Sequence, residues 1–267
     1  MDRPNILLII TDQQRADHLG CYGNELLKTP NIDTLAERGT VFRRFYVSNP
    51  ICSPNRATLM TGRLPSAHGL RCNGAPLPLE ARTFVECLAE KGYRTALFGK
   101  SHLQHMTGGP PEWLPSEEDF AVDENGFPVE AVRHDLTDEK YDNEDLHRWL
   151  DDINHKVKLP YYGFQKAELT TMHADRTGGD YLRWISERHP DHNSLRGAGN
   201  ALPDNRISTP QAWRTAIPEE LYSTTWVGSR TIDYLQDHAL NHANSPFFIK
   251  CSFPDPHHPF TPPGKYW

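Results

Sequence analysis

The chain has 267 residues, which is enough for one large domain with a buried core or for two small ones. It carries 28 basic and 35 acidic residues, for a net charge of −7, so it is not expected to bind nucleic acid or an anionic membrane through bulk charge. No apolar run approaches the ~20 residues that span a bilayer. The N-terminal run at residues 6–10 is too short for a signal peptide. We therefore expect a cytoplasmic protein with neither a membrane nor a nucleic acid as partner.

The cysteines exclude two further classes of protein. None of the five is paired as C-x-x-C, and their spacings of 31, 20, 15 and 164 residues match neither a zinc knuckle nor a disulfide framework. They are Cys21, Cys52, Cys72, Cys87 and Cys251.

Strand and helix patterns alternate over the first hundred residues. The continuous apolar run at residues 5–11 predicts a parallel strand that is covered on both faces. A helix is predicted over residues 30–38, because Thr29 and Pro30 favour its start and Gly39 its end. A second strand is predicted over residues 41–47.

The next elements follow the same alternation. Thr83 and Gly92 mark the two ends of a predicted helix, and a strand is expected at residues 93–98. A long helix is predicted after Pro218, and residues 247–253 form the last predicted strand. The expected apolar face of the long helix consists of Leu221, Thr225, Gly228, Ile232, Leu235 and Ala239. The fold class is therefore α/β, with a mainly parallel sheet sandwiched between helices.

The region between Gln104 and Ala216 lacks this pattern and is rich in Pro, Gly, Asp and Glu. We interpret it as a long irregular insertion of loops and short helices at the rim of the sheet, without a core of its own. Seven of the fourteen histidines lie here, among them His134, His155 and His173. Since these histidines show no metal-ligand spacing, they are expected to be solvated or to line a pocket.

Residues able to do chemistry follow the predicted strands and begin one helix. Asp12, Lys100 and His257 each follow a strand, and ligands of open α/β sheets bind at that edge. Pro54 suits a first helical turn, so Cys52 lies at a helix N-terminus, where a thiolate is stabilised. Arg56, four residues on, can bind an oxyanion there. The alternative is a structural cysteine beside a surface arginine; a cysteine phosphatase is disfavoured because its loop needs a longer, glycine-rich spacing.

Four segments together resemble one family. CSPNRATLMTGR resembles the C-x-P-x-R signature of the type I sulfatases, and PNILLIITDQ, GKSHL and PHHPF resemble further motifs of that family in the same order. The likeness covers about residues 4–102 and 218–267. It implies an alkaline-phosphatase-like fold and hydrolysis of a sulfate monoester.

The resemblance assigns a role to each matching residue. Cys52 is oxidised to formylglycine by a separate formylglycine-generating enzyme, and the hydrated aldehyde is the nucleophile. Arg56 then steadies the diol and Lys100 neutralises sulfate oxygens. His102 acts as the base in sulfate release, and His257 protonates the leaving alcohol.

The resemblance also implies a divalent cation held by Asp12, Gln13 and the modified Cys52. Oxygen ligands favour Ca²⁺, with Mg²⁺ or Mn²⁺ as alternatives. Many family members carry two Asp where this chain has Asp-Gln, a variation that resembles a subgroup of sulfatases and phosphonate hydrolases.

Two alternative functions therefore stay open, a hydrolase of phosphonate monoesters or phosphodiesters and a non-catalytic binding protein. The family pattern continues past Trp267 with further metal ligands and a lysine. We thus expect residues 1–267 to be an N-terminal sulfatase-like domain that is incomplete at its C-terminus.

Overall fold

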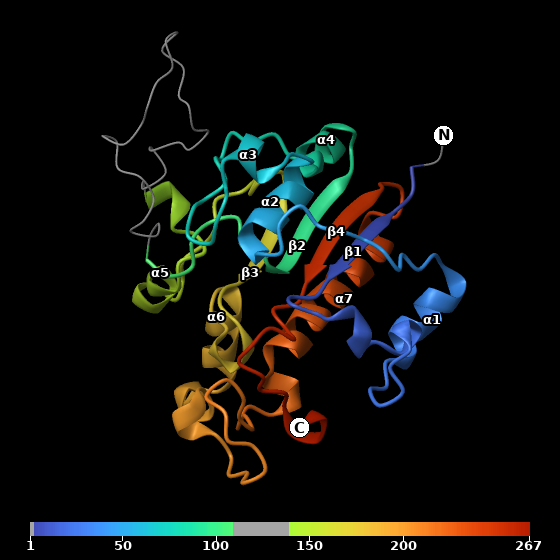
Figure 1. Cartoon of the computed structure of the whole chain (residues 1–267). Coiled ribbons are helices and arrows are strands. Elements are labelled where there is room, and N and C mark those ends of the chain that lie inside the picture. Colours follow the sequence, from blue (N-terminus) through green and yellow to red (C-terminus); the bar gives the residue numbers. More distant parts are fainter. Residues whose placement is uncertain (1–2, 109–138) are drawn as a thin grey trace, which may run out of the picture.

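The computed structural model describes residues 3–108 and 139–267 (Figure 1). Within these residues the core is a four-stranded parallel sheet with the order β1-β4-β2-β3. The strands are β1 (Ile6–Ile10), β2 (Arg94–Lys100), β3 (Lys166–Thr170) and β4 (Phe247–Ser252). The prediction of an α/β fold built on a parallel sheet is confirmed.

Helices cover both faces of the sheet (Figure 1). One face packs against α2 (Cys52–Thr61) and α4 (Phe84–Glu90), with the short α3 (Pro65–His68) beside α2. The other face packs against α7 (Ser223–Asn241), and α6 (Asp180–Arg188) continues that layer. Helix α4 begins with a capping box between Thr83 and Glu86, which confirms the predicted cap.

The region at 104–216 adds an element that its composition did not indicate. Besides α6, the short helix α5 (Leu146–Asp151) and several 3₁₀ turns, it supplies β3, which pairs with β2. Leu169 of β3 is fully buried in the core beneath α2 and α4. The insertion thus extends the sheet itself, and it brings the loop after β3 to the same edge as the other strand ends.

The structure corrects two sequence predictions. Residues 41–47 form no strand, and Phe45 and Tyr46 are 76% and 84% exposed. The predicted apolar face of the long helix is only partly confirmed. Leu221 and Leu235 pack against the core, but Ile232 is 54% exposed, and the buried Trp226 and Tyr234 of α7 were not predicted. The helix carries apolar residues on two sides, so only packing against the sheet selects the buried one.

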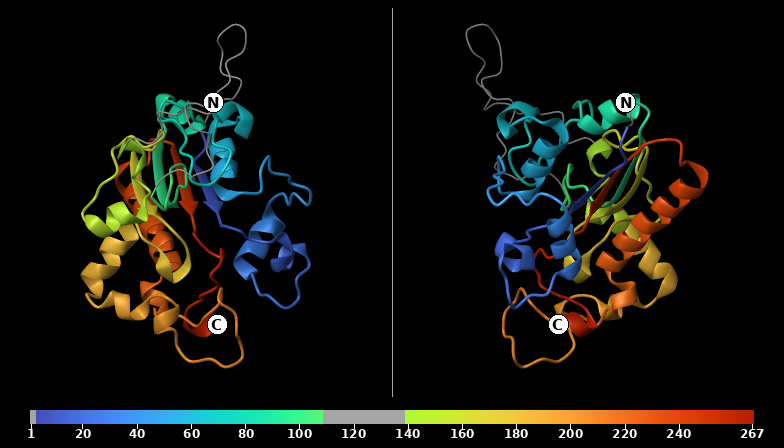
Figure 2. Two further views of the ribbon diagram at one scale, coloured as in Figure 1. Left: turned by 60° about the vertical axis from the view of Figure 1, so that its left-hand side comes forward. Right: turned by 90° about the vertical axis from the view of Figure 1, so that its right-hand side faces the viewer.

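The first strand differs from the prediction in one further respect. Leu7 and Ile9 of β1 are 43% and 52% exposed, so the described part of the chain covers only one face of this strand. Helix α1 (Pro30–Arg38), which has the predicted bounds, stands to one side of the sheet (Figure 2). Among the described residues, no helix combines the length and the apolar character required to cross a bilayer.

The turn at the end of β2 requires a glycine. Gly99 has φ +100°, and a Cβ at this position would lie 1.9 Å from the backbone oxygen of Ser252 in β4. We expect Gly99→Ala to lower the free energy of unfolding by more than ~3 kcal/mol, because both the backbone conformation and the strand contact are lost.

Denaturant unfolding of both variants checks this expectation. Gly228→Ala in α7 is the matched control, since its new methyl group meets open space and should raise stability by about 0.5–1 kcal/mol. A Gly99→Ala protein within 1 kcal/mol of the parent would contradict the assignment.

Candidate functional site

The carboxyl ends of the strands bring together the residues that the motifs singled out. Asp12 follows β1, Lys100 ends β2, and His257 follows β4. Non-glycine residues with positive φ also gather here, at Gln13 (58°) and His102 (55°) among others. Such backbone conformations are costly for residues with a side chain, and they concentrate where function demands a fixed geometry.

A buried carboxylate surrounded by cations forms the base of the site. Lys100 Nζ donates to Asp12 Oδ2, and Arg56 Nη2 lies 3.8 Å from the same oxygen. Burial alone would raise the pKa of Asp12, but the hydrogen bond from His173 and the charges of Lys100 and Arg56 hold it well below its ordinary value. Asp12 is therefore ionised at neutral pH although only 5% of it is exposed.

Arg56 is fixed from two sides. Its Nη1 donates at 2.9 Å to the backbone oxygen of Lys100 and at 2.9 Å to Ser252 Oγ. The guanidinium thus bridges the ends of β2 and β4. Because Arg56 is buried in α2, the helix that begins at Cys52 is held against the edge of the sheet.

Cys52 is the first residue of α2, as its motif predicted, and is partly exposed. Its thiol donates to Asn73 Oδ1 at 3.4 Å, and the same oxygen accepts the backbone N–H of Ser53 at 3.2 Å. The sequence did not single out Asn73, whose only local signal is the turn-like pair Asn73-Gly74. The contact orients the thiol at the helix N-terminus.

One open cleft of about 460 Å³ contains the sulfur and the acidic end of β1. Its walls include Asp12, Gln13, Cys52, Asn55, Arg56, Asn73, His257 and His258. Lys100 and His102 are buried and, among the described residues, do not belong to these walls. Five of the seven sequence-predicted site residues therefore line one open cleft, and the other two are buried.

The two adjacent histidines have different partners. His257 Nδ1 donates to the backbone oxygen of His258 at 2.6 Å, which leaves its Nε2 free to exchange a proton. His258 Nδ1 lies 3.0 Å from Gln13 Oε1. Burial lowers the pKa of His257.

Glu144 holds the turn after β2, a role that no sequence motif indicated. Its fully buried carboxylate accepts the backbone N–H groups of His102, Leu103 (2.9 Å) and Gln104 (3.2 Å), and the hydroxyl of Tyr161 at 2.7 Å. Burial and the nearby cations hold the pKa of His102 well below its ordinary value, so its ring is neutral.

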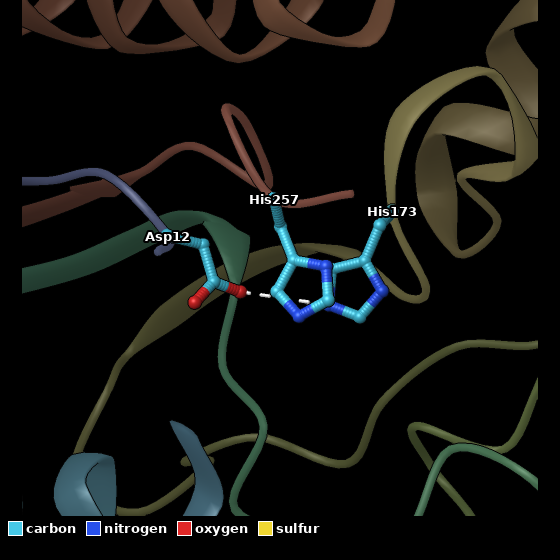
Figure 3. Close-up of side chains that lie close together, drawn as sticks. All are labelled: Asp12, His173 and His257. Atoms are coloured by element: carbon cyan, nitrogen blue, oxygen red, sulfur yellow. Dashed lines mark ion pairs between the residues drawn. The ribbon is translucent and has the colours of Figure 1, made fainter. Parts of the chain in front are cut away.

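His173 is the largest difference between expectation and structure. Its Nε2 lies 3.5 Å from Asp12 Oδ2 and contacts Lys100 Nζ, and its ring stacks on that of His257 (Figure 3). Burial lowers the pKa of His173 to about 4. Histidine spacing could not find this residue, because β3 brings it to the site. His134, from the same region, lies outside the described residues, and His155 packs against Trp149 away from the cleft.

The donor groups suit a hard divalent cation only in part. Asp12 offers a carboxylate oxygen and Gln13 an amide oxygen on the same wall of the cleft. Single ligand atoms of Asp12, His173 and His257 also lie within 4.8 Å of one another. The described residues therefore supply one anionic ligand beside neutral ones, whereas Ca²⁺ takes six to eight oxygens.

Comparison with known proteins shows which protein family this chain matches. A family model described as Sulfatase matches residues 4–266. The chain is 27% identical to an arylsulfatase of Clostridium perfringens, over 99% of this chain and 46% of that protein. It is 28% identical to the uncharacterized sulfatase YidJ of Escherichia coli, over 100% of this chain and 41% of that protein. The chain thus spans less than half the length of these relatives.

Solved structures share the fold. The phosphonate monoester hydrolase of Agrobacterium radiobacter superposes with a TM-score of 0.63 at 27% identity, covering 99% of this chain and 43% of that one. The phosphonate monoester hydrolase of Silicibacter pomeroyi gives 0.60 at 19% identity, covering 99% and 44%. The predicted alkaline-phosphatase-like fold is confirmed.

Beneath Arg56 lies a lysine for which the described residues provide no hydrogen-bond partner. Lys250 is fully buried in the middle of β4, and burial, reinforced by the charge of Arg56, lowers its pKa to about 7. Since an unfolded lysine titrates near 10.4, the unfolded chain binds more protons between pH 7 and 10. Stability should therefore rise with pH through this window.

We expect Lys250→Met to raise the free energy of unfolding at pH 7 by about 2–4 kcal/mol and to remove this rise, because no buried charge must then be accommodated. Unfolding measured at pH 7, 8.5 and 10 checks this, with the exposed Lys156→Met as control. Parallel pH profiles for Lys250→Met and the parent would contradict it.

Proposed function

Because the chain belongs to the sulfatase family, we propose that it hydrolyses sulfate esters and that Cys52 is the precursor of its nucleophile. The observation that carries the proposal is the shared cleft whose walls include Cys52, at the start of α2, together with Asp12, Arg56 and His257. A sulfate ester spreads negative charge over its oxygens in the transition state, and this cleft is built on buried cations.

Two groups that the chain acquires complete the chemistry in this proposal. Formylglycine, made from Cys52 by a formylglycine-generating enzyme, would supply the attacking oxygen. A divalent cation, which we propose to be Ca²⁺, would be held by Asp12 and Gln13 and would supply positive charge beside the sulfate.

The chain's own residues bind the sulfate and move protons. Arg56, whose guanidinium is fixed by two hydrogen bonds, lines the cleft together with Cys52, and Lys100 adds a positive charge from the buried end of β2. Protonated His257 donates a proton from Nε2 to the leaving oxygen. The negative charge of a bound sulfate raises the pKa of His257, so that it can act as a general acid near neutral pH. His102 is held neutral, the form that accepts a proton during sulfate release.

Modification of Cys52 can be tested directly. We expect the peptide that contains Cys52 to be lighter by about 18 Da after expression with a formylglycine-generating enzyme, because an aldehyde replaces the thiol. The modified protein should then hydrolyse 4-nitrophenyl sulfate, and Cys52→Ala should not.

The same assay separates the alternatives. Faster turnover of a phenyl phosphonate monoester than of the aryl sulfate would favour a phosphonate hydrolase. An unmodified thiol in the presence of the converting enzyme would favour a binding protein.

Arg56 provides a second test. We expect Arg56→Ala to lower kcat/KM for the aryl sulfate by roughly 10²-fold or more, because the cleft loses a preorganised cation. Arg56→Lys retains the charge but loses the bridge to Ser252, so it should fall between the parent and Arg56→Ala.

Thermal unfolding of each variant separates a loss of chemistry from a loss of fold. Arg63→Ala, an exposed arginine just beyond the same helix, is the matched control and should retain full activity. Normal turnover by a folded Arg56→Ala protein would remove Arg56 from the mechanism.

A further inference from the structure

We propose that His173 is a positioning residue. It holds the imidazole of His257 in the orientation in which that ring protonates the leaving group. This inference rests on the proposed sulfate-ester hydrolysis and adds to it a residue from the inserted region. Neither the sequence motifs nor the family resemblance assigns a role to His173.

The stacking of the two rings is the first observation. The centroids of His173 and His257 lie 3.6 Å apart with an angle of 11° between the planes, so one flat ring covers the other (Figure 3). The ring centroid of His258 lies 4.3 Å from that of His257, with an angle of 31° between the planes. The bond from His257 Nδ1 to the backbone of His258 restrains rotation of the ring, and the stack restrains its tilt.

The backbone around His173 is the second observation. Met172 and Ala174, its two chain neighbours, have φ angles of 60° and 55°. Left-handed conformations cost on the order of 1–2 kcal/mol for each non-glycine residue. Two such residues flanking one side chain indicate that the fold maintains the position of His173, next to His257, at the expense of stability.

The third observation is a cross-link between the two loops that carry the stacked rings. The backbone N–H of Asp175 donates to Thr261 Oγ1 at 3.2 Å, and Thr261 lies four residues beyond His257. The buried carboxylate of Asp175 accepts Trp213 Nε1 at 2.8 Å and Thr215 Oγ1 at 3.1 Å. The loop after β3 and the loop after β4 are thus tied together next to the stack.

These contacts separate two possible roles for the His173 side chain. Its Nε2 contacts both Lys100 and Asp12, whereas its flat face contacts His257. A positioning role depends on the flat face of the His173 ring. A role as metal ligand or as a partner of Lys100 depends on a nitrogen.

Three substitutions distinguish these roles in the metal-loaded protein with modified Cys52. His173→Phe keeps a flat ring and removes both nitrogens, His173→Asn keeps a polar group and removes the ring, and His173→Ala removes both. His147→Ala, an exposed histidine of α5, is the matched control. Each protein is assayed with 4-nitrophenyl sulfate, which has a good leaving group, and with phenyl sulfate, which needs more protonation.

We expect His173→Ala and His173→Asn to lower kcat for phenyl sulfate by about 10- to 100-fold, with a much smaller loss for 4-nitrophenyl sulfate and little change in KM. His173→Phe should recover most of the loss and retain the bound metal. In a His257→Ala background, His173→Ala should have no further effect, because the group that it positions is gone.

Other outcomes overturn the inference. Recovery by Asn but not by Phe, or loss of metal in His173→Phe, would assign the role to a nitrogen. Equal losses on both substrates, or additive losses in the double variant, would show a structural effect unrelated to His257. If the parent protein hydrolyses no sulfate ester, the proposed function fails instead, and the two failures are thereby distinguished.

Discussion

The ionised carboxylate of Asp12, buried at the end of the first strand, is the interaction on which the site depends. A buried anion is stable only when cations and hydrogen-bond donors surround it, and Lys100, Arg56 and His173 do so from β2, α2 and the loop after β3. Helix α2 is therefore held against the edge of the sheet by a charge pair, and the loop after β3 by the hydrogen bond of the neutral His173, in addition to apolar packing. The same arrangement leaves the positively charged Arg56 at the wall of the cleft.

Two further buried carboxylates act as anchors for the loops of this edge. Glu144 gathers the backbone N–H groups that follow β2, and Asp175 gathers side-chain and backbone donors around the loop after β3. Both belong to the inserted region, and both serve loops that carry site residues. The insertion therefore extends the sheet and also holds in place the loops that carry site residues.

The prediction from sequence succeeded where the signal is local. The bounds of α1, the cap of α4 and the place of Cys52 at a helix start follow from residues within one turn of each other. It failed where a distant neighbour decides, as for the exposed segment 41–47 and for the buried face of α7. A run of aromatic and β-branched residues such as 41–47 forms a strand only if another strand pairs with it, and none of the described strands does.

The sequence by itself determined the parallel α/β fold, the motif cysteine with its arginine, and the presence of Asp12, Lys100 and His257 at one edge, because strand ends and helix starts are coded by neighbouring residues. Only the tertiary structure decided that His173, Asn73 and Glu144 join them. Their partners lie between 17 and 161 residues away along the chain, and no local pattern specifies which side chains a fold will bring into contact across such distances.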